Sequence, residues 1–142
     1  MIKAGKTTVY LYRHHDGYPA CAGVDLAEAL ATSKTCTALV QTLLDRRYDK
    51  QSYETDAKRM YEVTTDVHGD IEWLYKITFS GDFGRVVKVG CEGIRFTADH
   101  EDKIGQVAKT LKATDTVEEF TAYVKREEAD MLARIEARKA GG

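Results

Sequence analysis

The densest group of side chains that could do chemistry lies at one expected turn, and its members are Arg13, His14, His15, Asp16 and Tyr18. Gly17 and Pro19 provide the backbone geometry that a turn requires, and we expect Gly17 to adopt a positive φ. The segment therefore carries a guanidinium, two imidazoles, a carboxylate and a phenol that a simple turn does not need. Binding and catalytic residues concentrate on such loops, so the pattern predicts a functional turn.

The two histidines suggest a metal site, but their spacing argues against one. Adjacent residues of an extended chain point to opposite sides, so His14 and His15 reach one ion only where the strand has already ended. The chain offers as further ligands Asp16, Cys21, His68, Asp70 and His100. None of them occurs at HExxH or CxxC spacing. We therefore predict no metal and no cofactor, and we expect the histidines to hydrogen-bond the backbone of the turn.

Catalytic signatures are absent from the sequence. No serine lies in a GxSxG elbow, and Cys21, although near the histidines, has no signature of a nucleophilic cysteine. No glycine-rich loop of a nucleotide-binding type follows a strand. A carboxylate pair for hydrolysis could come from one expected hairpin, whose acids are Glu62, Asp66, Asp70 and Glu72. The alternative is that these acids only solvate the hairpin.

The composition describes one domain covering residues 1–142, with 43% hydrophobic and 31% charged residues. No apolar run reaches the roughly 18 residues of a membrane helix, and the N-terminus lacks the apolar segment of a secretion signal, so we expect a cytoplasmic protein with no membrane contact. The net charge of −2 argues against nonspecific coating of nucleic acid. Because Cys21, Cys36 and Cys91 are odd in number and lack CxxC spacing, we expect reduced and mostly buried thiols.

The first third of the chain predicts a strand, the turn and two helices. Thr7–His14 has the alternation and the β-branched and aromatic content of a central strand. A helix should begin at about Asp25, as its N-cap, and a second near residues 33–35. Arg46 and Arg47 suit the negative end of the second helix. Polar residues then predict a surface connection at 48–58.

The middle of the chain predicts an antiparallel meander. Residues 60–65, Ile71–Ser80 and Arg85–Val89 alternate as strands, and turn residues separate them. The alternation of the second strand directs Trp73 and Tyr75 to one buried face. A stacking platform for nucleotide bases is the alternative role for these aromatic residues.

The last third predicts helices. Residues 101–112 carry a helical pattern weakened by Gly105. A final helix should begin after Thr116, which forms a capping box with Glu119. Residues 126–142 are mostly charged, so we expect this end of the helix to project from the domain. The predicted fold class is α+β, an antiparallel sheet of about four to five strands packed against three to four helices, with a long C-terminal helix.

Two segments resemble a group of small, uncharacterised proteins encoded by bacteriophages and other mobile elements. YRHHDGYP, followed by Gly23, Asp25 and Leu26, is similar to an RHxDGYP-like turn of that group, and HGDIEWLYKI is similar to a D-IEYLY-like strand. The similarity covers mainly Val9–Leu30 and Gly69–Ile77. It implies a phage or prophage origin and points to the same turn, but it carries over no catalytic residue.

Together these features favour a phage accessory protein that binds a host or phage macromolecule, either a protein or a protein–nucleic acid complex. Inhibition of a host defence complex of the restriction or CRISPR type is one such role, by analogy of size and origin. The expected binding residues are Arg13, His14, His15, Asp16, Tyr18, Asp66, Asp70 and Glu72. The last three could present carboxylates that compete for a nucleic-acid channel.

Two alternatives stay open. The protein could be a small enzyme or ligand-binding protein with its site at the same turn, where His14 or His15 acts as an acid or base. It could also be a structural homodimer joined through the C-terminal helix.

Overall fold

A computed structural model of the protein describes residues 1–66, 73–81, 84–95, 106–114 and 116–141. In chain order its elements are β1 (Ile2–Ala4), β2 (Thr7–Arg13), η1 (Pro19–Gly23), α1 (Val24–Thr32), α2 (Cys36–Leu44), β3 (Tyr61–Thr64), β4 (Trp73–Phe79), β5 (Val86–Arg95), β6 (Gln106–Thr114) and α3 (Val117–Gly141). The short η1 is a π-helical turn that runs directly into α1. The predicted α+β fold class is confirmed.

These strands form one mixed sheet in the order β3-β2-β1-β4-β5-β6. β1 pairs antiparallel with β2 and parallel with β4, and the other neighbouring pairs are antiparallel. The tight link between β1 and β2 pairs Ala4 with Thr7, so only Gly5 and Lys6 lie between the strands. Gly5 has a φ of 61°, which a residue without a side chain adopts at little cost. The predicted central strand is confirmed, because β2 lies between β3 and β1.

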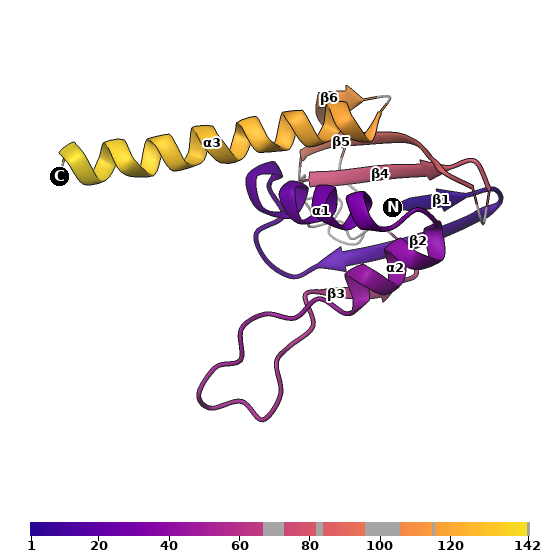
Figure 1. Ribbon diagram of the computed structural model, residues 1–142, viewed down its shortest axis with the longest axis horizontal. Helices are drawn as coiled ribbons and strands as arrows, with labels where there is room; N and C mark the ends of the chain where they lie inside the picture. The colour runs from indigo at the N-terminus through magenta and orange to yellow at the C-terminus, as the bar shows by residue number, and fades with distance from the viewer. Residues whose placement is uncertain (67–72, 82–83, 96–105, 115, 142) are drawn as a thin grey trace.

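The helices cover one face of the sheet, and the hydrophobic core lies between the two layers (Figure 1). The largest fully buried apolar side chains are Phe120, Ile2, Leu39, Val89, Val124 and Cys91. On β4, Ile77 and Phe79 are buried and Trp73 and Tyr75 pack against this core half-buried, as their alternation predicted. β4 therefore directs its odd-numbered residues to the helices.

The predicted meander is wrong in one of its pairings. β3 does not form a hairpin with β4, because it pairs with β2, and β4 takes β1 as its parallel neighbour. The period-two pattern identified both strands correctly, but alternation does not specify which strand lies next to which. The turn predicted at 67–70 lies outside the described residues. The pairing of β4 with the following strand β5 is confirmed.

The helix predicted at 101–112 is also wrong. Residues 106–114 form β6, which pairs antiparallel with β5, and 101–105 lie outside the described residues. Val107, Thr110 and Thr114 are β-branched and favour strands. Because the helical pattern was weak, the hydrogen-bonding edge of β5 decided the conformation.

α2 and α3 begin where the sequence predicted. The Thr35 side chain accepts a hydrogen bond from the Ala38 amide at 3.2 Å, and the Thr116 side chain accepts one from the Glu119 amide at 3.0 Å. Each bond satisfies an amide that the first helical turn leaves unpaired. Within the described part of the chain, no helix is both long and apolar enough to span a membrane.

α1 and α3 pack closely at Gly23, where η1 ends. A Cβ atom at this position would lie 2.6 Å from Cγ1 of Val124, a side chain that is fully buried. Only a residue without a side chain lets α3 approach this closely. This close contact explains why the chain has a glycine at position 23.

We predict that Gly23→Ala lowers the free energy of unfolding by about 1–3 kcal/mol, because the added methyl must displace buried Val124. Chemical denaturation measures the change. The matched control is Gly90→Ala, where a Cβ meets no atom within 4 Å and stability should stay nearly constant. Equal stability of the two variants would contradict the packing described for α3.

The buried side chains of α3 all lie in its first turns, namely Phe120, Tyr123 and Val124. Figure 1 shows the rest of the helix extending beyond the sheet. We therefore expect that deleting residues 126–142 leaves the domain folded, with a melting temperature within a few degrees of the full chain. A large loss of thermal stability, or a change from dimer to monomer in light scattering, would show instead that this end is structural or oligomeric.

Candidate functional site

Side chains from three parts of the chain hold the backbone of the turn that follows β2. Nε of Arg13 donates to the His15 carbonyl at 2.8 Å, and the His15 amide donates to the Tyr48 hydroxyl at 3.1 Å. The Tyr75 hydroxyl of β4 donates to the Gly17 carbonyl at 2.8 Å. The main chain is therefore fixed from both sides, as a preorganised binding loop requires.

The backbone strain of the turn lies at a different residue from the one predicted. Asp16 has a φ of 55°, whereas Gly17 is not among the residues with positive φ. The expectation for Gly17 was wrong by one position. Aspartate tolerates this left-handed conformation better than most residues, because its short side chain can bond locally. Asp16 thus combines the bend of the chain with an exposed carboxylate.

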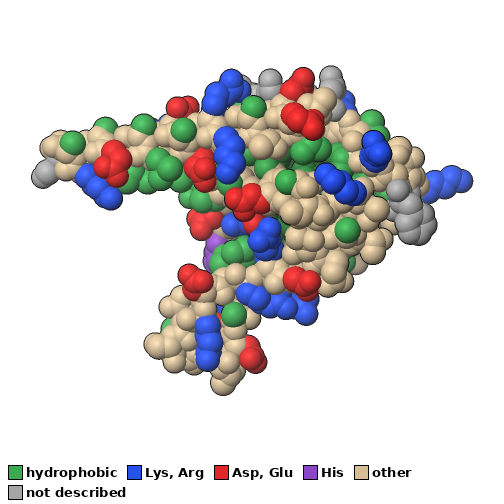
Figure 2. All heavy atoms as spheres, viewed as in Figure 1, with side chains coloured by type: hydrophobic (Ala, Val, Ile, Leu, Met, Phe, Trp, Pro, Cys, Tyr) green, Lys and Arg blue, Asp and Glu red, His purple; other side chains and the backbone are tan. Residues whose placement is uncertain are grey.

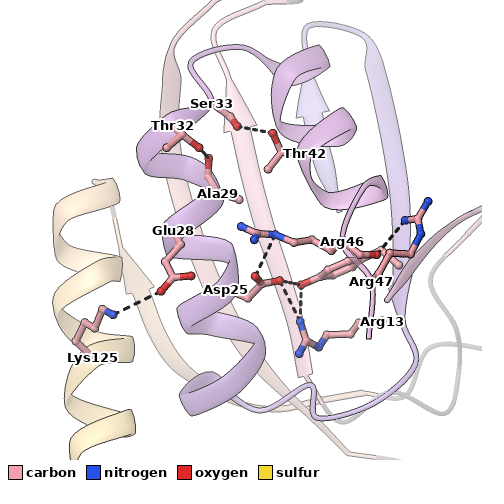
Figure 3. Close-up of polar contacts among 11 residues, drawn as sticks. Arg13, Asp25, Glu28, Ala29, Thr32, Ser33, Thr42, Arg46, Arg47 and Lys125 are labelled. Atoms are coloured by element: carbon pink, nitrogen blue, oxygen red, sulfur yellow. Dashed lines mark hydrogen bonds and ion pairs between the residues drawn. The ribbon is translucent and has the colours of Figure 1, made fainter. Parts of the chain in front are cut away.

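Arg13 directs its guanidinium into the protein, where it meets Asp25 of α1 and Tyr61 of β3. Its Nη1 lies 3.1 Å from Oδ2 of Asp25 and 2.7 Å from the Tyr61 hydroxyl. The same hydroxyl donates to Oδ2 of Asp25 at 2.7 Å. Figure 3 shows Asp25 between Arg13 and Arg46, whose Nε approaches Oδ1 to 3.3 Å. Residues of β2 and β3 and of the connection after α2 thus all contact one carboxylate of α1.

The electrostatics of this cluster favour the charged arginine. Burial alone would lower the pKa of Arg13, but Tyr61 and Asp25 outweigh that effect and raise it. Burial raises the pKa of Tyr61 far above its usual range, so its hydroxyl stays a hydrogen-bond donor. The side chains of Arg13 and Asp25 are only 13% and 16% exposed. Arg13 therefore acts as a positioning residue, and Asp25 is the centre of this cluster rather than the predicted N-cap of α1, a place taken by Gly23.

The other side chains of the turn are exposed. His14 Nε2 lies 3.5 Å from Oε2 of Glu62 on β3, and its ring meets Tyr12 edge-on at a centroid distance of 5.2 Å. The ring of His15 lies 5.6 Å from that of Tyr48. These contacts orient both imidazoles without removing them from solvent.

Tyr18 is 36% exposed and closes the turn. A hydrogen bond to the Cys21 side chain is the main cause that raises the pKa of Tyr18 to about 12. The Tyr18 carbonyl accepts hydrogen bonds from the amides of Cys21 and Ala22, both at 3.0 Å. The phenol therefore stands at the start of η1, neutral and held in place.

A cavity of about 430 Å³ opens beside the turn. Aromatic residues of the strands line it, namely Tyr10, Tyr12, Tyr61, Trp73 and Tyr75, together with all residues from Arg13 to Tyr18. Leu26 of α1 and Leu43 of α2 add apolar surface. The cavity has the size and the mixed lining of a ligand site.

The α-amino group of Met1 lies at this cavity and donates to the Tyr75 carbonyl at 2.9 Å. Burial, and then the positive charge of Lys76, lowers the pKa of the amine to about 5. The amine is therefore neutral at pH 7, and it extends the hydrogen bonding between β1 and β4 by one bond.

Of the four predicted acidic residues of the hairpin, the structure describes two, Glu62 and Asp66. Asp66 is exposed and lines the cavity, while Glu62 faces His14 from β3. Asp70 and Glu72 lie outside the described residues. Because β3 and β4 are not neighbours, the single hairpin that was expected to carry these acids does not form.

Among the described residues, no three side chains of histidine, cysteine, aspartate or glutamate come together as metal ligands. All three cysteines are free thiols, with Cys36 and Cys91 buried and Cys21 partly exposed, as expected. Burial raises the pKa of Cys91 to about 12, so this thiol is unreactive near neutral pH.

Comparison of the chain with protein-family models, curated proteins and solved structures found no match.

Sequence reasoning missed Tyr48, Tyr61 and Tyr75 as supports of the turn. Each is a tyrosine whose hydroxyl reaches a group at least 33 positions away in the chain. The only signal in the sequence was the high number of tyrosines, which is eight. Tyrosine suits this role because it combines an apolar ring with a polar tip.

We predict that Arg13→Met lowers the free energy of unfolding by about 3 kcal/mol, because Asp25 and the Tyr61 hydroxyl lose their main partner. Urea denaturation measures this. Arg59→Met, at an exposed arginine, is the control and should change stability by less than about 0.5 kcal/mol. Equal effects would show that the Arg13 cluster does not hold the fold together.

Proposed function

We propose that this protein is a binding protein that holds a macromolecular partner at the turn of residues 13–18. The observation that carries the proposal is the contrast between a backbone held by three partly buried side chains and turn side chains left exposed. Interactions that serve only the fold would not need two imidazoles, a carboxylate and a phenol at the surface. A rigid loop also loses little conformational entropy on binding, which favours affinity.

The surroundings of the turn support a large partner. Figure 2 shows a notch between the projecting α3 and the loop after α2, with histidine exposed within it and hydrophobic side chains along the adjoining side of α3. Leu132 of α3 is 53% exposed. Aromatic side chains such as tyrosine, with apolar surface beside them, are typical of protein interfaces.

The resemblance to phage-encoded proteins suggests the origin of the partner. A phage accessory protein of this size would act on a host macromolecule, and inhibition of a defence complex is one such action. Of the carboxylates proposed to mimic nucleic acid, Asp66 lies at the cavity. Loss of phage growth on a host that carries the defence system, when the protein is deleted from the phage, would test this role.

We predict that His14→Ala, His15→Ala and Tyr18→Ala each abolish or strongly weaken capture of the partner from infected cells. The melting temperature should move by only a few degrees, because the three side chains are exposed. Tyr53→Ala is the matched control, since Tyr53 is 80% exposed and is not among the cavity residues. The proposal fails if the three variants lose function only in proportion to the fraction that unfolds.

A second candidate is a small ligand-binding protein or enzyme with the same site. The cavity of about 430 Å³ favours it, and the pairing of His14 with Glu62 could orient an acid–base imidazole. Both side chains are more than a third exposed, so the pair is weak. A metabolite that raises the melting temperature of the wild type, but not of His14→Ala, would favour this candidate over a macromolecular partner.

A further inference from the structure

Within the described part of the chain, no strand lies between the last residues of β2 and the first residues of β4. β1 lies between β2 and β4, and its register pairs Ile2 with Val9 on one side and with Ile77 on the other. β2 continues past this point to Arg13, and β4 begins earlier, at Trp73. Among the described residues, no strand pairs with the edge of Leu11–Arg13 that faces β4. None pairs with the edge of Trp73–Tyr75 that faces β2. We call the space between these two edges the gap.

The cavity coincides with this gap. Its lining includes Leu11 and Arg13 of β2, Trp73 and Tyr75 of β4, and Met1, which directly precedes β1. Two strands that flank one missing strand lie roughly 10 Å apart, which is the room one extended chain requires. Figure 1 shows β1 beginning near the point marked N.

The backbone on the β2 side points into the gap at alternate residues. The His14 amide donates to the Met60 carbonyl at 3.3 Å, so even-numbered residues of this strand face β3. Successive residues of a strand direct their N–H and C=O groups to opposite edges. The amides and carbonyls of Leu11 and Arg13 therefore face the gap.

The β4 side is arranged in the same way. The Met1 amine donates to the Tyr75 carbonyl at 2.9 Å, and the Ile77 amide donates to the Met1 carbonyl at 3.0 Å. The odd-numbered residues of β4 therefore direct their backbone groups toward β1. By the same alternation, the Tyr75 amide and the Trp73 carbonyl face the gap beyond Met1.

We propose that the gap between β2 and β4 receives an extended segment of the partner protein, which continues β1 as a strand of the sheet. The inference deepens the proposed function and rests on it. A small molecule could fill the volume, but an extended peptide also satisfies the backbone groups on both edges, which is the basis of binding by strand addition. Run in the direction of β1, the segment is antiparallel to β2 and parallel to β4.

The two faces of the gap specify the side chains of that segment. Odd-numbered residues of β2 and β4 point to the helices, as Arg13 shows by its contact with Asp25 and Tyr75 by its ring contact with Phe120. A partner residue opposite Leu11 therefore points to the same side, toward Leu26 and Leu43. The next residue points to the opposite face, where the tyrosines of β2 lie. The site selects apolar residues at alternate positions.

An extension of the chain ahead of Met1 tests the gap directly. We predict that the sequence Thr-Val-Thr-Val, added before Met1, enters the gap as a strand and slows hydrogen exchange at the amides of Leu11, Arg13 and Tyr75 by about tenfold or more, the effect of one added hydrogen bond. The matched control is Thr-Val-Pro-Pro, in which the two residues nearest Met1 cannot donate to Leu11 or Trp73. Both extensions convert the buried amine into an amide, so only strand formation distinguishes them.

Equal exchange rates in the two extended proteins would overturn the inference. A second measurement compares how much of the partner the two extended proteins capture. Thr-Val-Thr-Val should reduce capture at least tenfold, and Thr-Val-Pro-Pro should not. If the alanine variants of the turn abolish capture but the protein extended with Thr-Val-Thr-Val still captures the partner, the inference is wrong and the proposed function stands. If the turn variants leave capture intact, the proposed function itself fails.

Discussion

The carboxylate of Asp25 is the contact on which the rest of the structure depends. It accepts a hydrogen bond from the Tyr61 hydroxyl of β3 and forms an ion pair with Arg13 at the end of β2. It also lies within ion-pair distance of Arg46, which follows α2. A charge this little exposed is costly unless it is paired, so the arginines and the carboxylate fix one another's positions. α1 is thereby locked over β2 and β3. Arg13 also donates a hydrogen bond to the His15 carbonyl, and this bond couples the turn to the core.

The fold positions a rigid loop beside an incomplete part of the sheet. Tyr48 and Tyr75 both hold the backbone of the turn. β1 is only three residues long, and among the described residues no other strand continues it between β2 and β4. Exposed side chains of the turn therefore lie in one cavity with strand edges that pair with no other described strand. A partner that uses both would gain side-chain specificity from the turn and main-chain hydrogen bonds from the gap.

Local patterns in the sequence predicted the local structure better than the pairing of strands. The alternation of Thr7–His14, the helix start expected near residues 33–35 and the capping box of Thr116 identified β2, α2 and α3, because these signals depend on neighbouring residues. Arg13 was expected at the binding surface, but its partners Asp25 and Tyr61 are 12 and 48 positions away, a distance over which one sequence gives no pairing information. For the same reason the placement of β3 beside β2, and the gap beside β1, could not be foreseen.

Photo-crosslinking from position 18 tests most directly whether the turn is the binding surface. Tyr18→p-benzoylphenylalanine places a photo-reactive ring at an exposed position of the turn, and the same substitution at Tyr53 provides an exposed reference outside the cavity. The account predicts that irradiation of the complex joins the partner to position 18 and not to position 53. Crosslinking from position 53, with none from position 18, would contradict it.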